Sequence, residues 1–158
     1  MELENCYIIG EFGVNEQREI CEKPKALMTG SITKQGYLHY PGGIDYIFSC
    51  NIHEITDEMY LDVRGFKGTC ANAEINGVKF PIPWKADAVI NVSKLIKLGE
   101  NKIVISVFGS PRNMLGPLHI TNKPLVTKDS CFCPFGDNYT EEYITSDIGL
   151  FETPTIIY

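Results

Sequence analysis

The chain has 158 residues, of which 44% are hydrophobic and 22% charged, and its formal net charge is −6 at pH 7. This length suits one domain with a single core, stable without metals or disulfides. The acidic balance argues against nucleic acids and anionic membranes, which attract Lys and Arg. No apolar run reaches the ~18 residues of a membrane span, and residues 1–5 lack the basic start of a signal peptide, so a cytoplasmic location is favoured.

Short segments rich in Ile, Val, Phe and Tyr alternate with turn-forming residues along the chain, as expected for strands. Asn76-Gly77 predicts a two-residue hairpin, because both positions of a type I′ turn need positive φ. Ser93 and Gly99 suit the two ends of a helix of one or two turns. The predicted strands cover residues 6–9, 26–33, 44–52, 59–64, 71–75, 78–82, 88–92 and 102–108.

These elements predict one all-β domain over residues 1–158, an antiparallel β-sandwich or jelly roll. From Asp129 onward the sequence becomes irregular, so this segment is expected to wrap the sandwich or to contact a neighbouring domain. The six cysteines are scattered, and we expect reduced structural thiols rather than disulfides. Cys131 and Cys133, with one residue between them and no second pair, make a poor zinc site with His119, so no metal is expected.

The sequence offers no local signal of catalysis. It contains neither a G-x-S-x-G elbow nor an H-E-x-x-H helix, and His39, His53 and His119 lie far apart in the sequence. Carboxylates for a glycosidase pair exist, but their polar, turn-like surroundings are typical of solvated surface charge: Asp57, Glu58, Glu141 and Glu142. We therefore assign no catalytic residue and no cofactor, and we rank a small independent enzyme below the binding alternatives.

Two segments between strands, residues 35–43 and 109–119, combine aromatic and polar residues as sugar-binding sites do. Each candidate also has a structural interpretation. Tyr37 suits a core or rim position, Trp84 suits a cover for one end of the sandwich, and the polar pair 112–113 suits a tie that fixes its loop. The candidate ligand-binding residues are Gln35, Tyr37, Trp84, Arg112, Asn113 and His119.

The sequence around the predicted hairpin resembles a known family. Residues 73–78, Trp84 and residues 88–107 together resemble the sugar-binding domain of glycoside hydrolase family 2 and its relatives, a galactose-binding-like jelly roll. The segment 109–119 is similar to accessory C-terminal domains of large bacterial glycosidases, including α-L-rhamnosidase-like proteins. The opening residues 7–13 and the end of the chain fit the same pattern, so the likeness covers most of the chain.

The resemblance implies a non-catalytic accessory domain, because the catalytic carboxylates of such enzymes lie in a separate barrel. Its expected partners are carbohydrate, the catalytic domain of the parent glycoside hydrolase, or both. Jelly rolls of this class often hold a structural Ca²⁺, but no dense acidic loop is present here, so none is assigned. The alternative from another class is a protein-interaction or structural β-sandwich without sugar affinity.

Overall fold

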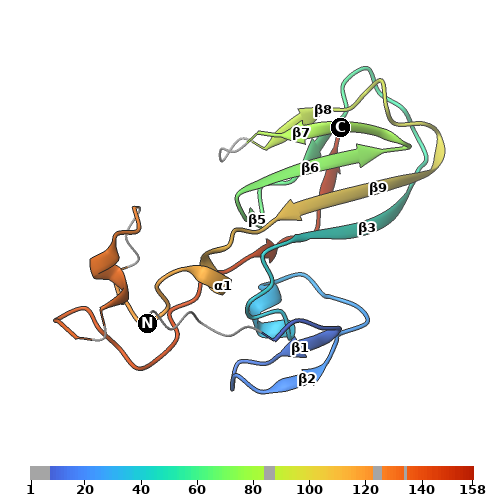
Figure 1. Ribbon diagram of the computed structural model, residues 1–158. Helices are drawn as coiled ribbons and strands as arrows, with labels where there is room; N and C mark the ends of the chain where they lie inside the picture. The colour runs from blue at the N-terminus through green and yellow to red at the C-terminus, as the bar shows by residue number, and fades with distance from the viewer. Residues whose placement is uncertain (1–7, 84–87, 123–125, 134) are drawn as a thin grey trace.

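The computed structural model describes residues 8–83, 88–122, 126–133 and 135–158, and within them the chain is built almost wholly from antiparallel strands (Figure 1). The helices described are single turns: η1 (Ile32–Gln35), α1 (Arg112–Leu115) and η2 (Asp129–Phe132). The predicted all-β class is confirmed. The strands are β1 (Phe12–Val14), β2 (Ile20–Glu22), β3 (Gly43–Ile52), β4 (Tyr60–Asp62), β5 (Phe66–Lys67), β6 (Cys70–Ile75), β7 (Val78–Ile82), β8 (Val89–Asn91), β9 (Gly99–Phe108), β10 (Gly149–Leu150) and β11 (Thr155–Ile157).

Two sheets form the sandwich. The larger has the order β3-β9-β6-β7 and the smaller β11-β4-β8, and every pairing in them is antiparallel. The longest pairing joins β3 and β9 over ten residues of each strand. Two short ladders, β1-β2 and β10-β5, accompany the sheets. Figure 1 shows β1 and β2 below the large sheet, beside the start of β3.

The core lies between the two sheets. In β9 every second side chain is buried, from Asn101 to Val107, as the two-residue period of a half-buried strand requires. Ile105 of β9 and Leu61 of β4 are both fully buried and belong to the same apolar cluster. Burying a side chain of this size stabilises the fold by about 1.5–3 kcal/mol, so the sheets stabilise each other.

The predicted hairpin is confirmed. Ile75 pairs with Val78, and the two residues between them have positive φ, 50° at Asn76 and 91° at Gly77. The short helix predicted between Ser93 and Gly99 does not form. The chain makes a single hydrogen-bonded turn there instead, which the backbone bond from Ile96 N to Val92 O (3.1 Å) closes.

That turn stops because the next amide is used elsewhere. Lys97 N donates to the side chain of Asn101 at 2.9 Å instead of continuing the turn. Ser93 does not cap it either, since its hydroxyl accepts from Met59 N (2.9 Å) on the opposite side of the ladder. Gly99, predicted to be left-handed, has φ 86° and begins β9.

One predicted strand is wrong, and a second does not form in the part of it that the structure describes. Residues 26–33 form a loop that enters η1, because Gly30 has φ 120° and the chain then closes into a 3-10 turn. The segment still makes two backbone bonds, Gly30 N to Leu150 O (2.6 Å) and Ile32 N to Ile148 O (2.8 Å). Of the strand predicted at residues 6–9, only the last two residues are described; they are exposed and not in a strand.

The end of the chain returns to the sandwich, as one of the two alternatives for this segment predicts. β10 pairs with β5, and β11 adds to the small sheet beside β4. Before that return, residues 116–122, 126–133 and 135–142 project away from the sheets (Figure 1). The described ranges contain no helix of the length and apolarity that crossing a bilayer requires.

Candidate functional site

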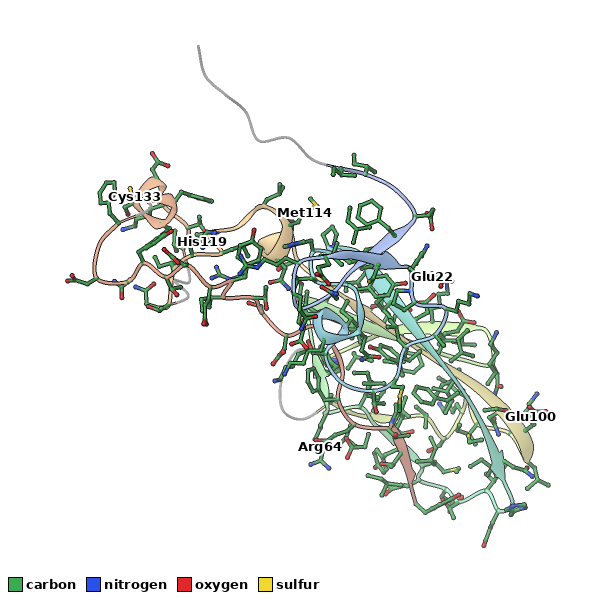
Figure 2. The ribbon with its side chains drawn as sticks, turned by 90° about the horizontal axis from the view of Figure 1, so that it is seen from below. Glu22, Arg64, Glu100, Met114, His119 and Cys133 are labelled. Carbon is green, nitrogen blue, oxygen red and sulfur yellow. The ribbon has the colours of Figure 1, made fainter. Side chains whose placement is uncertain are left out.

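Connections gather at one end of the sandwich, which we call the loop end. Figure 2 shows Met114, His119 and Cys133 toward this end and Glu100 at the opposite one. The start of β3 and the end of β9 position the loop end. Gly43 and Phe108 are paired there, so both strands meet the loops at the same place. It comprises residues 8–14, 36–41, 109–120 and 138–148.

The segment after η1 brings two tyrosines together. Gly36 ends η1 with φ 87°, and a Cβ on it would lie 2.8 Å from Pro24, so glycine is needed for this close approach. The rings of Tyr37 and Tyr40 then meet edge to face, with centroids 5.4 Å apart. Their hydroxyls donate to backbone carbonyls, Tyr37 to Pro24 and Tyr40 to Gly43, both at 3.3 Å.

A pocket of about 300 Å³ opens beside these tyrosines. Most of its lining side chains are apolar, and Met114 reaches it from α1. Its charged members, Lys23 and Glu11, form an ion pair with each other. The pocket therefore suits an apolar or aromatic group better than a charged one. It is lined by residues 8–12, Val14, Lys23, residues 36–41 and Met114.

Asn113 is a structural tie at the centre of the loop end. Its side chain is 1% exposed and bonds to both backbone groups of Ser146, donating to the carbonyl and accepting from the amide, each at 2.8 Å. The Asn113 carbonyl in turn lies 2.6 Å from Nδ1 of His39. One buried residue thus holds three segments of the chain together.

A ring cluster extends this tie. Tyr143 lies between two imidazoles, with its centroid 5.9 Å from that of His39 and 5.1 Å from that of His119. The guanidinium carbon of Arg18 lies 4.5 Å from the centre of the Tyr143 ring, a cation–π distance. Nδ1 of His119 is 3.0 Å from the Thr140 carbonyl. The two histidines, far apart in sequence, therefore contact the same tyrosine ring.

Charges pin the last part of the loop end to β5. Lys67 Nζ lies 3.1 Å from Asp147 Oδ2 and 4.4 Å from the centre of the Phe151 ring. Burial alone would raise the pKa of Asp147, but hydrogen bonds from Lys67 and Ser31 outweigh it and lower that pKa.

One nitrogen of the Arg112 guanidinium lacks a hydrogen-bond partner. Its Nη2 is buried from solvent and has no hydrogen-bond partner in the described chain. Leaving such a group unpaired typically costs about 1–3 kcal/mol or more. Because Nη2 is closed off from solvent, this unpaired group is a cost within the loop end and not a donor offered at its surface.

The structure separates the other predicted ligand residues. The Gln35 amide is already bonded to its own loop, accepting from Met28 N (2.8 Å) and donating to the Met28 and Ser31 carbonyls (both 3.2 Å). Tyr37 lines the pocket with Met114, whereas Gln35 and Arg112 are absent from its lining. Trp84 lies outside the described residues.

His119 faces a second, more polar hollow of about 290 Å³, together with Cys131 and Cys133. No group of three or more His, Cys, Asp or Glu side chains suited to a metal ion occurs in the described ranges. The carboxylates considered for catalysis are Asp57, Glu58, Glu141 and Glu142, and all four lie at the surface rather than facing each other in a pocket described here.

The fold is an antiparallel β-sandwich whose long connecting loops lie together at the loop end. No family model and no curated protein matches the chain. Its fold is similar to part of a solved rhamnosidase from Novosphingobium sp. PP1Y, with a TM-score of 0.52 and 18% sequence identity over 75% of this chain. The match covers 11% of that rhamnosidase chain, so this chain corresponds in fold to a small part of a much longer protein.

Proposed function

We propose that this chain is a non-catalytic module of a glycoside hydrolase, and that its loop end docks on another part of the enzyme and braces it. The observation that carries the proposal is the likeness of fold to 11% of a rhamnosidase chain. A module of that relative size contributes surface to an enzyme whose chemistry is performed elsewhere.

The polar groups of the loop end favour bracing over sugar recognition. A sugar site needs side-chain donors and acceptors that are free to meet hydroxyls. The side chains of Gln35 and Asn113 are bonded within the chain, and so is Nδ1 of His119. The neighbouring apolar side chains Met114 and Leu115 are 38% and 50% exposed, and exposed apolar groups suit a protein surface.

Carbohydrate binding is the second candidate function, and the pocket beside Tyr37 supports it. Two tyrosine rings line about 300 Å³, which is the lower end of the size range for small-molecule sites. A sugar there would stack on the rings of Tyr37 and Tyr40, and Tyr37 is one of the six ligand residues predicted from sequence.

A photo-crosslinking experiment tests the docking. A photoreactive amino acid at Leu115, expressed in the source cells, should attach the loop end to a segment bearing a glycoside hydrolase catalytic domain, identified by mass spectrometry. The matched control places the same group at Val78, which is 51% exposed but lies on the Asn76–Gly77 hairpin. Crosslinks from Leu115 to unrelated proteins, or equal yields from both positions, would overturn the proposal.

Two assays on the purified chain separate the remaining alternatives. A panel of nitrophenyl glycosides should show no hydrolysis, and turnover by the isolated chain would refute a non-catalytic role. Glycan-array screening followed by calorimetry should show no specific sugar. Specific binding that is lost in Tyr37→Ala would replace bracing by carbohydrate recognition.

A further inference from the structure

The large sheet has two edges, and their sequences differ in kind. The β7 edge carries Lys79 and Pro81, residues that natural proteins use to stop another strand from pairing with an edge. The β3 edge, at Gly43–Ile52, has no Lys, Arg or Pro. Its pairing with β9 runs through ten consecutive residue pairs without a bulge. One edge is protected and the other is open.

The register shows which backbone groups of β3 are free. Gly109 N donates to Gly42 O at 3.1 Å, so these opposed residues form a hydrogen-bonded pair. Such pairs alternate along an antiparallel ladder, which makes even-numbered residues of β3 the partners of β9. The odd-numbered residues therefore point their amides and carbonyls away from β9. Beyond the Gly43 carbonyl, which Tyr40 caps, the outward-facing residues have no other backbone partner in the described chain: Asp45, Ile47, Ser49 and Asn51.

A groove of about 460 Å³ runs along this open edge. One wall is β3 itself, residues 43–48, and the other is the loop of residues 24–27 and Thr29, with Tyr37 also in the lining. Six strand residues span about 20 Å, and an added strand would lie about 4.8 Å from β3. Because the loop forms the far wall, the groove admits a single extended segment, whereas the sheet of a second copy would meet that loop.

The solvent face of β3 indicates the chemistry of the occupant. Ile47 is 66% exposed in the middle of the strand. Asp45 accepts a hydrogen bond from Ser106 Oγ at 2.6 Å and has no ion pair in the described chain. Opposite-charge and apolar cross-strand pairs stabilise a sheet. A matching segment therefore carries an apolar residue opposite Ile47 and Lys or Arg opposite Asp45.

We propose that the open edge of β3 is a binding site for an extended peptide segment of another protein, which adds as a fifth strand in the groove between β3 and residues 24–29. The backbone groups of Asp45, Ile47 and Ser49 bind its main chain, and their side chains select apolar and basic residues. The site lies along the sheet edge and shares only Tyr37 with the loop end, so it does not depend on the proposed bracing role.

Peptide selection tests the proposal. A phage-displayed library of random octapeptides is selected on the full chain, and the strongest binder is made as a labelled synthetic peptide. We expect affinity for the wild-type chain to fall about tenfold or more in Ile47→Pro, because proline removes an outward amide but no bond to β9. Ile47→Val keeps that amide and should change the affinity by less than about twofold. Failure to enrich any peptide, or equal binding to the proline variant, would overturn the proposal.

Two measurements on the wild-type chain keep the test valid if Ile47→Pro does not fold. Amide exchange should slow on peptide binding at Asp45, Ile47 and Ser49 and stay unchanged at the residues between them, which already bond to β9. Two peptides are N-methylated at alternate residues, one at the odd positions and one at the even positions. Methylation of the amides that face β3 should abolish binding, and methylation of the others should not. Equal affinity of the two methylated peptides would refute strand addition. A concentration-dependent dimer through β3 would assign the edge to a second copy and also refute the proposal.

Discussion

Asn76 Nδ2 donates a hydrogen bond to Asn101 Oδ1 at 2.8 Å and joins the β6–β7 hairpin to the start of β9. Asn101 is 0% exposed, and its amide is fully used. Its oxygen also accepts from Lys97 N (2.9 Å), and its nitrogen donates to the carbonyls of Lys97 (2.7 Å) and Gly99 (2.9 Å). This side chain therefore fixes the turn that precedes the longest pairing of the large sheet.

Replacing Asn101 by Leu should destabilise the chain by about 2–4 kcal/mol, because Lys97 N, two carbonyls and the Asn76 amide lose a part-buried partner at once. Urea unfolding followed by circular dichroism measures the change. Asn72→Ala, on the exposed face of β6, is the matched control and should stay within about 0.5 kcal/mol of wild type. A loss of less than about 1 kcal/mol at Asn101 would show that the network contributes little.

The sequence predicts the parts of this fold whose signals are local. Asn76-Gly77 needs positive φ at both positions, and the alternation of apolar residues in β9 continues over many residues, so both are readable from the chain. The strand predicted at 26–33 is apolar enough, but its course depends on Gly30 and on contacts with residues 148–150 that no local pattern contains.

The candidate site was less predictable for the same physical reason. The composition of residues 109–119 indicates a candidate loop, but the bond between Asn113 and Ser146 joins residues 33 positions apart. Tyr143 joins His39 and His119 only once the chain has folded. Composition does not distinguish a polar side chain that faces a ligand from one that is hydrogen-bonded inside the loop.

Asn113→Ala should release the loop end while leaving the sandwich core intact. It removes both bonds to Ser146, and we expect a loss of about 2–3 kcal/mol. Limited proteolysis should then cut within residues 138–148 faster than in wild type, and amide exchange of Ser146 should accelerate. Asn122→Ala, at an exposed position, should change neither. Unaltered protection of Ser146 in Asn113→Ala would contradict the role of this tie.

Gly149→Ala tests the crossing where β10 passes the loop before η1. Gly149 has φ 140°, and a Cβ there would lie 2.3 Å from Gly30 O and 3.0 Å from Tyr46 Oη. Because backbone cannot yield as a flexible side chain does, the loss should exceed about 3 kcal/mol. Gly136→Ala is the matched control: φ is 110°, but apart from its chain neighbours no atom of the described residues lies within 4 Å of an added Cβ, so the backbone cost of about 1 kcal/mol is what remains. Equal losses at both sites would show that the crossing is not tightly packed.

The Asp62–Arg64 pair gives a pH dependence of known sign. Hydrogen bonds from Arg64 Nε to both oxygens of Asp62 (2.9 Å each) lower the pKa of that carboxyl below its ordinary value of 3.8. The unfolded chain therefore binds the proton more readily than the folded one, so the contribution is present above about pH 4 and lost as the pH falls through the folded pKa.

The measurement compares unfolding free energies of wild type and Asp62→Asn between pH 2 and 7. The difference should be at most about 1 kcal/mol at neutral pH, since Arg64 is largely exposed, and should shrink toward acid. Asp57→Asn removes an exposed carboxylate that forms no ion pair in the described chain and is the control for the loss of a surface charge. A difference in unfolding free energy between wild type and Asp62→Asn that grows toward acid would contradict the lowered pKa of Asp62.

Cys50 should be the slowest-reacting thiol among the described cysteines. All five of them are free, and Cys6 lies outside the described residues: Cys21, Cys50, Cys70, Cys131 and Cys133. Burial raises the pKa of the Cys50 thiol, which lowers the fraction of reactive thiolate at pH 8, whereas Cys70 and Cys133 are exposed. Iodoacetamide labelling with peptide mapping should therefore show Cys50 modified about tenfold or more slowly than Cys70. Unfolding in urea should make the two rates similar, because the difference arises from β3 packing against the core. Equal rates in the native chain would show that Cys50 does not pack against the core.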